Sequence, residues 1–144
     1  MNPTENRRAS ACDVRETFFG MLGLCRKAGR VIIGVDLICR ALRSAKEKPV
    51  LVFLSATASD NTCKKMMDKC GHYRVPCLLI RADSERLGRQ LGKAGPVAAV
   101  AIADSAFAQA LEKECVHRQQ DPAGSAEGEE MYGGDETRTN RKRL

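Results

Sequence analysis

Short apolar segments that alternate with helical patterns constrain the fold of this 144-residue chain more than any other feature. Val50 to Leu54 is an uninterrupted apolar run, which is typical of a strand in the middle of a sheet that is covered on both faces. Three further segments have the length of strands: Arg30 to Ile33, Cys77 to Ile80 and Val97 to Ile102. This order predicts an α/β fold, a single-domain three-layer α/β/α sandwich with a four-stranded mixed sheet.

Five helices complete this prediction, and their ends carry local signals. Gly29 suits the left-handed position that ends the first helix. Ser59 or Asp60 is expected to cap the third helix, and Asp104 the last one. The expected helices run from about Arg15 to Lys27, Val35 to Ser44, Asp60 to Tyr73, Asp83 to Leu91 and Asp104 to about Val116.

The two ends of the chain differ in composition from its centre. Residues 1–13 are polar, and the segment after Val116 is rich in Gly and in charges of both signs, with almost no aliphatic residues. We therefore expect a disordered leader over residues 1–13, one folded domain over 14–116 and a flexible charged tail over 117–144. The start lacks the apolar centre of a secretory signal, and no apolar run reaches the ~20 residues that span a bilayer, so we expect a cytoplasmic protein.

The charge of the chain is concentrated in the predicted domain. The formal net charge is +6, with a pI near 9.1. From Val116 onward five Lys or Arg residues face six acids, a net charge of −1, so the preceding 115 residues carry +7. A compact domain with this excess attracts polyanions. Aromatic residues make up only 4% of the chain, which argues against base stacking on an aromatic platform.

Neither a metal site nor a cofactor is expected. The seven cysteines form no CxxC pair, and most lie inside apolar patterns, as reduced core thiols do. The alternative is a zinc site from Cys63, Cys70, His72 and Cys77, but its six-residue gaps do not supply the closely spaced pairs that zinc uses.

Sequence patterns of catalysis are also missing. The chain contains no Walker sequence, no G-x-G-x-x-G, no G-x-S-x-G and no His-Glu-x-x-His. A nucleophile pair from Cys70 and His72 is unsuitable, because residues two apart on a helix point in different directions. We therefore expect a binding protein and not an enzyme.

The segment from Met21 to Arg43 is the candidate binding site. Gly34 opens the second helix, and because it has no Cβ a partner can approach the backbone there, while Asp36 is a candidate cap. A helix start offers free N–H donors and a positive dipole end. Basic residues surround it: Arg26, Lys27, Arg30, Arg40 and Arg43. Such a surface suits an RNA backbone, and the alternative is a solvated basic face of an ordinary α/β protein.

The order of several segments resembles the ribosomal protein family that binds kink-turn RNA, in particular its bacterial YlxQ-like branch. The segments are LGLCRKAGR with the following glycine, ASDNT before the third helix, and LGRQLGK before the last strand. The likeness covers about Phe18 to Glu114, which is nearly all of the predicted domain.

The resemblance implies a sandwich that docks on the sharp bend of an internal RNA loop. In that family, residues after the glycine reach the guanines of sheared G·A pairs, and a loop before the last strand packs on flipped-out nucleotides. The matching positions here are Gly34, Val35, Asp36, Leu37 and Arg40, with Gly95, Pro96 and Val97. Arg40 has donors that suit guanine O6 and N7, and Lys27, Arg30 and Lys93 would add phosphate contacts.

These observations leave three functional hypotheses. The first is an RNA-binding accessory protein of the ribosome or translation apparatus, a monomer that recognises ribosomal RNA or an mRNA leader, with ribosomal proteins as further partners. The second is a protein-interaction module of the same fold that has lost base readout, because Leu37 stands where family members carry a polar reader. The third is a substrate-recruiting domain that serves an RNA-modifying enzyme in trans.

Overall fold

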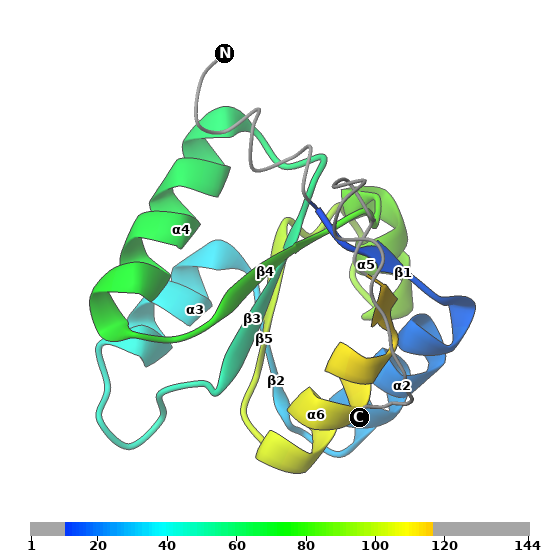
Figure 1. Ribbon diagram of the computed structural model, residues 1–144, viewed down its shortest axis with the longest axis horizontal. Helices are drawn as coiled ribbons and strands as arrows, with labels where there is room; N and C mark the ends of the chain where they lie inside the picture. The colour runs from blue at the N-terminus through cyan, green and yellow to red at the C-terminus, as the bar shows by residue number, and fades with distance from the viewer. Residues whose placement is uncertain (1–10, 117–144) are drawn as a thin grey trace, which may run out of the picture.

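A mixed four-stranded sheet forms the centre of the structure, a computed structural model that describes residues 11–116 (Figure 1). All five residues of the middle strand β3 are buried, as its uninterrupted apolar sequence predicts. β3 pairs in parallel with β4 and antiparallel with β5, which pairs antiparallel with β2. The sheet order is β2 (Val31–Ile33), β5 (Ala99–Ile102), β3 (Leu51–Ser55) and β4 (Cys77–Ile80).

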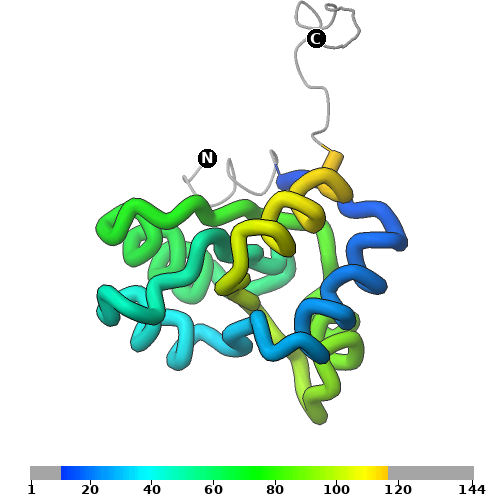
Figure 2. Tube along the Cα trace, turned by 90° about the horizontal axis from the view of Figure 1, so that it is seen from below, coloured from blue at the N-terminus to red at the C-terminus, as the bar shows by residue number. Residues whose placement is uncertain are grey.

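Helices cover both faces of the sheet, so the predicted three-layer α/β/α sandwich is confirmed (Figures 1 and 2). One layer consists of α3 (Val35–Leu42) and α4 (Asp60–Tyr73). The other consists of α2 (Glu16–Lys27), α5 (Ser84–Gln90) and α6 (Ser105–Lys113). None of the described helices has both the length and the apolar character needed to cross a membrane.

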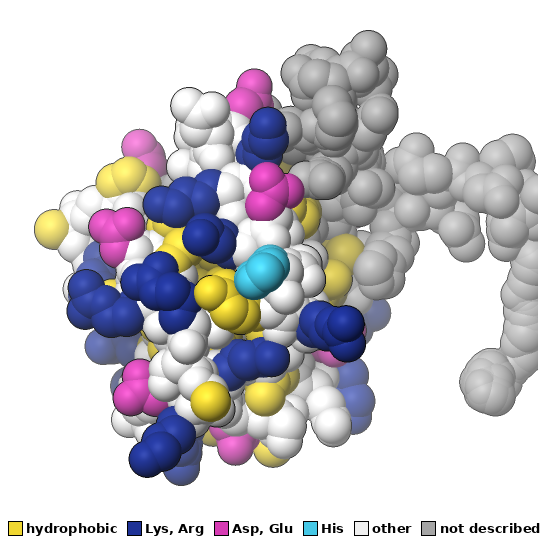
Figure 3. Space-filling view, turned by 90° about the vertical axis from the view of Figure 1, so that its left-hand side faces the viewer, with side chains coloured by type: hydrophobic (Ala, Val, Ile, Leu, Met, Phe, Trp, Pro, Cys, Tyr) yellow, Lys and Arg dark blue, Asp and Glu magenta, His cyan; other side chains and the backbone are white. Residues whose placement is uncertain are grey.

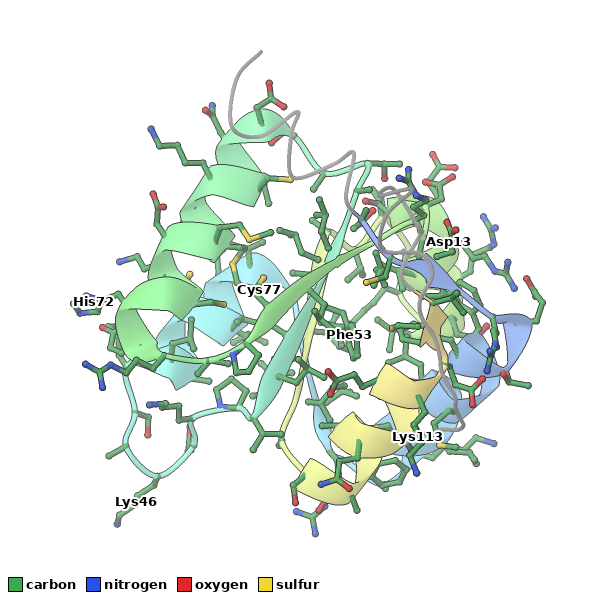
Figure 4. The ribbon with its side chains drawn as sticks, viewed as in Figure 1. Asp13, Lys46, Phe53, His72, Cys77 and Lys113 are labelled. Atoms are coloured by element: carbon green, nitrogen blue, oxygen red, sulfur yellow. The ribbon has the colours of Figure 1, made fainter. Side chains whose placement is uncertain are left out.

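Each face of the sheet has its own core, because successive strand residues point to opposite sides. Leu51 and Phe53 of β3 pack under the α2–α5–α6 layer, and Val52 and Leu54 pack under α3 and α4. Figure 4 shows Phe53 at the centre of the molecule. The cysteines are free thiols, and five of them are buried, in agreement with their placement in apolar patterns.

Three of the expected helix-end signals agree with the structure. Gly29 has a φ of 72°, Ser59 Oγ accepts from Thr62 N at 3.2 Å, and an Asp104 carboxylate oxygen accepts from Phe107 N at 3.0 Å. The last helix differs, because it ends at Lys113 and not near Val116. The residues that follow it form a strand, so the helical pattern stops where pairing to another segment begins.

A short two-stranded sheet extends the fold at both ends of the described chain. β1 (Asp13–Val14) pairs antiparallel with β6 (Cys115–Val116). Cys12 is buried, its N donates to Leu79 O at 2.9 Å, and its O accepts from Arg81 N at 2.8 Å. Residues 11–13, which the expected leader of residues 1–13 included, belong to the described structure, and two of them make these backbone contacts. Residues 1–10 of that leader and the expected tail over 117–144 lie outside the described residues.

Candidate nucleic-acid interface

Gly34 is the turning point between β2 and α3. Its backbone has φ 101° and ψ 146°, a region that is essentially restricted to glycine. Its N donates to Ala99 O at 3.1 Å, while its O accepts from Ile38 N at 3.0 Å and starts the helix. No side chain of the described residues caps α3. Asp36 lies exposed in the first turn and does not serve as the expected cap, because the position that a cap occupies is taken by Gly34.

An open groove of about 460 Å³ lies beside the start of α3. Leu37 has 49% of its surface exposed there, and Arg40 follows one turn later. Lys93 reaches the same groove from the loop between α5 and β5, although it is far from Arg40 in the sequence. The lining residues are Val31, Ile32, Ile33, Leu37, Arg40, Ala41, Glu47 and Lys93. The groove thus has an apolar floor, and two cations and one acid, Arg40, Lys93 and Glu47, are its charged lining residues.

The loop between α5 and β5 borders a second hollow of about 290 Å³, and Lys93 takes part in both. Gly95 and Pro96 are exposed and line this hollow together with Arg89. Val97 is different: only 5% of it is exposed, and its N donates to Ser84 O at 2.9 Å. Val97 therefore anchors the loop to the core, whereas Gly95 and Pro96 are exposed.

Close packing of two glycines positions this loop. A Cβ built on Gly88 would lie 2.0 Å from Gly95 O, so the last turn of α5 touches the loop backbone directly. Lys93 N donates to Gly88 O at 2.8 Å, and Gly92 has a φ of 71°. Gly88 is therefore required by this contact, and Gly92 by the left-handed backbone of the turn.

Lys27 and Arg30 do not join the cluster at Gly34. Ala103 N donates to Arg30 O at 2.9 Å, which fixes Arg30 at the opposite end of β2 from Gly34. The three residues of β2 lie between them, and four extended steps separate the two positions by about 13 Å. The side chains of Lys27 and Arg30 are exposed, so they remain available to a partner that extends beyond the groove.

The loop between β3 and α4 lies close to the loop at Gly95 and Pro96, and the sequence analysis used its ASDNT segment for the family resemblance but did not assign it to the binding site. It borders a hollow of about 400 Å³ together with Pro96 and the start of α5. Ser55 Oγ donates to Ala82 O at 2.6 Å, and Thr57 Oγ1 lies 3.0 Å from Ser84 Oγ, which ties this loop to α5. The signal in the sequence was a set of hydroxyl residues directly after a buried strand.

Comparison with known proteins identifies the family. A profile of the ribosomal protein L7Ae/L30e/S12e/Gadd45 family matches residues 17–112. The chain is 42% identical over 94 residues to the RNA-binding protein YlxQ of Bacillus subtilis, which covers 65% of this chain and 90% of that protein. The YlxQ protein of Enterococcus faecium is 35% identical over 95 residues, which cover 66% of this chain and 87% of that protein.

Solved structures agree with this assignment. A protein of unknown function from Bacillus halodurans superimposes with a TM-score of 0.61 at 28% identity, over 69% of this chain and 96% of the other. The 15.5 kD RNA-binding protein of Giardia lamblia has the same fold, with a TM-score of 0.58 at 15% identity, over 78% and 92% of the two chains. With its sequence, its profile match and its fold in agreement, the chain belongs to the ribosomal protein L7Ae/L30e/S12e/Gadd45 family, in the YlxQ-like branch.

Proposed function

We propose that this protein is an RNA-binding accessory protein of the ribosome or translation apparatus and that it recognises a kink-turn-like RNA through the start of α3. One observation carries the proposal: Leu37 and Arg40 of α3, the helix that Gly34 opens, border one groove with Lys93, which is distant in the sequence. The family and the names of the YlxQ relatives support RNA binding and a non-enzymatic role. The protein acts as a cytoplasmic monomer, with ribosomal RNA or an mRNA leader as candidate ligands and ribosomal proteins as candidate neighbours.

The residues of the groove, of the start of α3 and of the neighbouring loop have different roles in binding. Gly34 lets the RNA backbone approach the amides of Val35 to Leu37, which sit at the positive end of the helix dipole. Arg40 presents a planar guanidinium to a guanine edge, and Lys93 contacts phosphate. Gly95 and Pro96 provide a small exposed platform for an unstacked nucleotide.

Leu37 changes what can be read at this site. Its apolar side chain cannot accept a hydrogen bond from a guanine, so the base contact is left to Arg40 and the backbone. We expect Arg40→Ala to weaken binding of a kink-turn RNA by about 1–3 kcal/mol and to have a smaller effect on a straight duplex of equal length. Titrations at two salt concentrations measure both affinities.

The exposed Arg15→Ala variant on the opposite side of the sheet is the control and should bind both RNAs as the wild type does. A loss from Arg40→Ala that is equal for both RNAs would reassign Arg40 to a phosphate contact. Equal affinity of the wild type for kinked and straight RNA would remove the kink-turn proposal. Absence of any binding at low salt would remove RNA as the ligand.

A second candidate function follows from the apolar floor of the groove. Leu37 is half exposed beside Val31, Ile32 and Ile33, which would suit an apolar segment of a protein partner. A pull-down from nuclease-treated extract separates the two functions. Direct protein partners should remain after nuclease treatment and should be lost from Leu37→Asp, whereas partners that depend on RNA should disappear from the wild type.

A further inference from the structure

The outer side of the α3–α4 layer carries an excess of cations that the groove does not use. Residues 35–76 contain eight Lys or Arg and four acidic residues. Figure 3, which views this side, shows more basic than acidic side chains around His72, the one described histidine. Apart from Arg40, which belongs to the groove, the cations are Arg43, Lys46, Lys48, Lys64, Lys65, Lys69 and Arg74. We call these seven residues the cationic face.

Internal pairing does not account for these charges. The ion pairs between described residues include Arg81 with Asp13 and Arg86 with Glu16, both away from α3 and α4. Within residues 11–116, no member of the cationic face forms an ion pair. The neighbouring lysines Lys64 and Lys65 are exposed and repel each other. These exposed cations are therefore available to a partner of opposite charge.

The cationic face lies where a long ligand of the groove would continue. Arg40 belongs to the groove, and the exposed Arg43 follows it three residues later as the C-cap of α3. α4 packs beside α3 over the same core and, with 14 residues, is about 21 Å long. Lys65 and Lys69 are one helical turn apart, about 6 Å along its axis. Cations thus continue from the groove onto a neighbouring helix.

The chemistry of this face fits phosphate better than protein. Among described residues, the exposed large apolar side chains are Leu24, Leu37, Val50 and Val116, and none lies on α4. A protein interface of stable size normally has an apolar centre, which α4 does not offer. Lysines act as mobile point charges for phosphate and contact it without reading sequence.

We propose that the cationic face binds the phosphate backbone of a double-helical RNA stem that continues from the RNA docked at Gly34. This inference rests on the proposed function and adds a contact that is independent of base sequence. The stem lies along α4, and its contribution depends on the length of the stem and on salt.

The test uses the full chain and two kink-turn RNAs that differ in the length of one stem by about one turn of double helix. The wild type should bind the long-stem RNA about tenfold more tightly at low salt. The double variant Lys64→Gln/Lys65→Gln should lose this gain and bind the short-stem RNA as the wild type does. For the long-stem RNA, the slope of log affinity against log salt concentration should be smaller in magnitude by about 2 for the double variant than for the wild type.

The matched control is Arg15→Gln/Lys113→Gln, which removes the same charge from the opposite layer, where Figure 4 shows Lys113. It should keep the preference for the long stem. The inference is overturned if the wild type binds both RNAs equally, if the double variant keeps the preference, or if the control loses it to the same extent. In each of these outcomes, tight binding of the short-stem RNA leaves the proposed function intact, whereas failure to bind either RNA removes both.

Discussion

The two helix layers of this sandwich are held to the same sheet by different contacts. On the α2–α5–α6 side, Phe18 packs edge-on against Phe53 at 5.1 Å and against Phe19 at 5.5 Å between ring centroids. Arg86 lies 3.7 Å above the Phe19 ring and pairs with Glu16. Rings and an ion pair thus connect α2, β3 and α5, and the charges of this layer are partly satisfied within the protein.

The α3–α4 layer is packed with flexible, sulfur-containing side chains instead of aromatic rings. Its core contains Cys63, Met66 and Cys70 of α4 above Val52 and Leu54 of β3. A hydrogen bond with Cys77 lowers the pKa of Cys70, whereas burial raises the pKa of Cys25 to about 11 on the other side of the sheet. The contrast teaches that oriented aromatic and ionic contacts stabilise the α2–α5–α6 layer. The α3–α4 layer is held by its buried apolar face, and its outer face is left free to carry charge.

The largest expected change in stability concerns the aromatic cluster of Phe18, Phe19 and Phe53. Phe18→Ala should lower the free energy of unfolding by about 3–5 kcal/mol, because it leaves a cavity against two rings. Met66→Leu, an equally buried position of the other layer, should cost less than about 1.5 kcal/mol, because it conserves volume in a flexible core. Urea unfolding followed by circular dichroism measures both. Equal losses would mean that the two layers do not differ in how strictly they are packed.

Two helical glycines, one in each layer, should respond to alanine with changes of stability that are smaller than that of Phe18→Ala and opposite in sign to each other. Gly88→Ala should destabilise the protein by about 1–3 kcal/mol, because its Cβ would collide with Gly95 O and displace the loop of the groove. Gly71→Ala in α4 meets nothing within 4 Å, and should stabilise the protein by about 0.5–1 kcal/mol. Thermal unfolding of both variants checks the signs. A neutral Gly88→Ala would show that the loop yields easily.

The sequence predicts the layers and strands well because these follow from long apolar patterns. β3 and α4 are the clearest cases: an uninterrupted apolar run marks the buried strand, and Ser59 with periodic core residues marks the helix. The β1–β6 pair was not predicted, since two-residue strands have no periodicity, and their pairing depends on backbone contacts between the two ends of the domain.

The candidate site was predicted less completely, because its assembly depends on three-dimensional proximity. Gly34 was identified from its position before a helix, and its positive φ agrees with that reasoning. Arg30 appeared close to Gly34 in the sequence, but an extended strand holds the two apart. Val97 was expected to begin the last strand, and the resemblance placed it in the RNA-contacting loop, yet it is buried before β5 and its N donates to Ser84 O. Linear distance misleads wherever a strand or a tight loop intervenes.

The smallest expected effect is a pH dependence from the ion pair of the α2–α5–α6 layer. The hydrogen bond from Arg86 lowers the pKa of Glu16 below its usual 4.5. A carboxyl group whose pKa is lower in the folded state contributes stability above its unfolded pKa, and this contribution is lost as the pH falls through the folded value. The wild type should therefore lose stability on acidification below about pH 4.5 more steeply than Glu16→Gln does.

Thermal midpoints measured across this pH range for the wild type and Glu16→Gln give the comparison. Arg86→Gln should flatten the profile in the same way, because Glu16 then titrates at its ordinary pKa in both states. It should also lower the midpoint at neutral pH, since the guanidinium that lies over Phe19 is removed. Parallel profiles for the wild type and Glu16→Gln would show that the exposed pair of Glu16 and Arg86 is too well solvated to stabilise its layer. The aromatic contacts alone would then distinguish this layer from the one on the other side of the sheet.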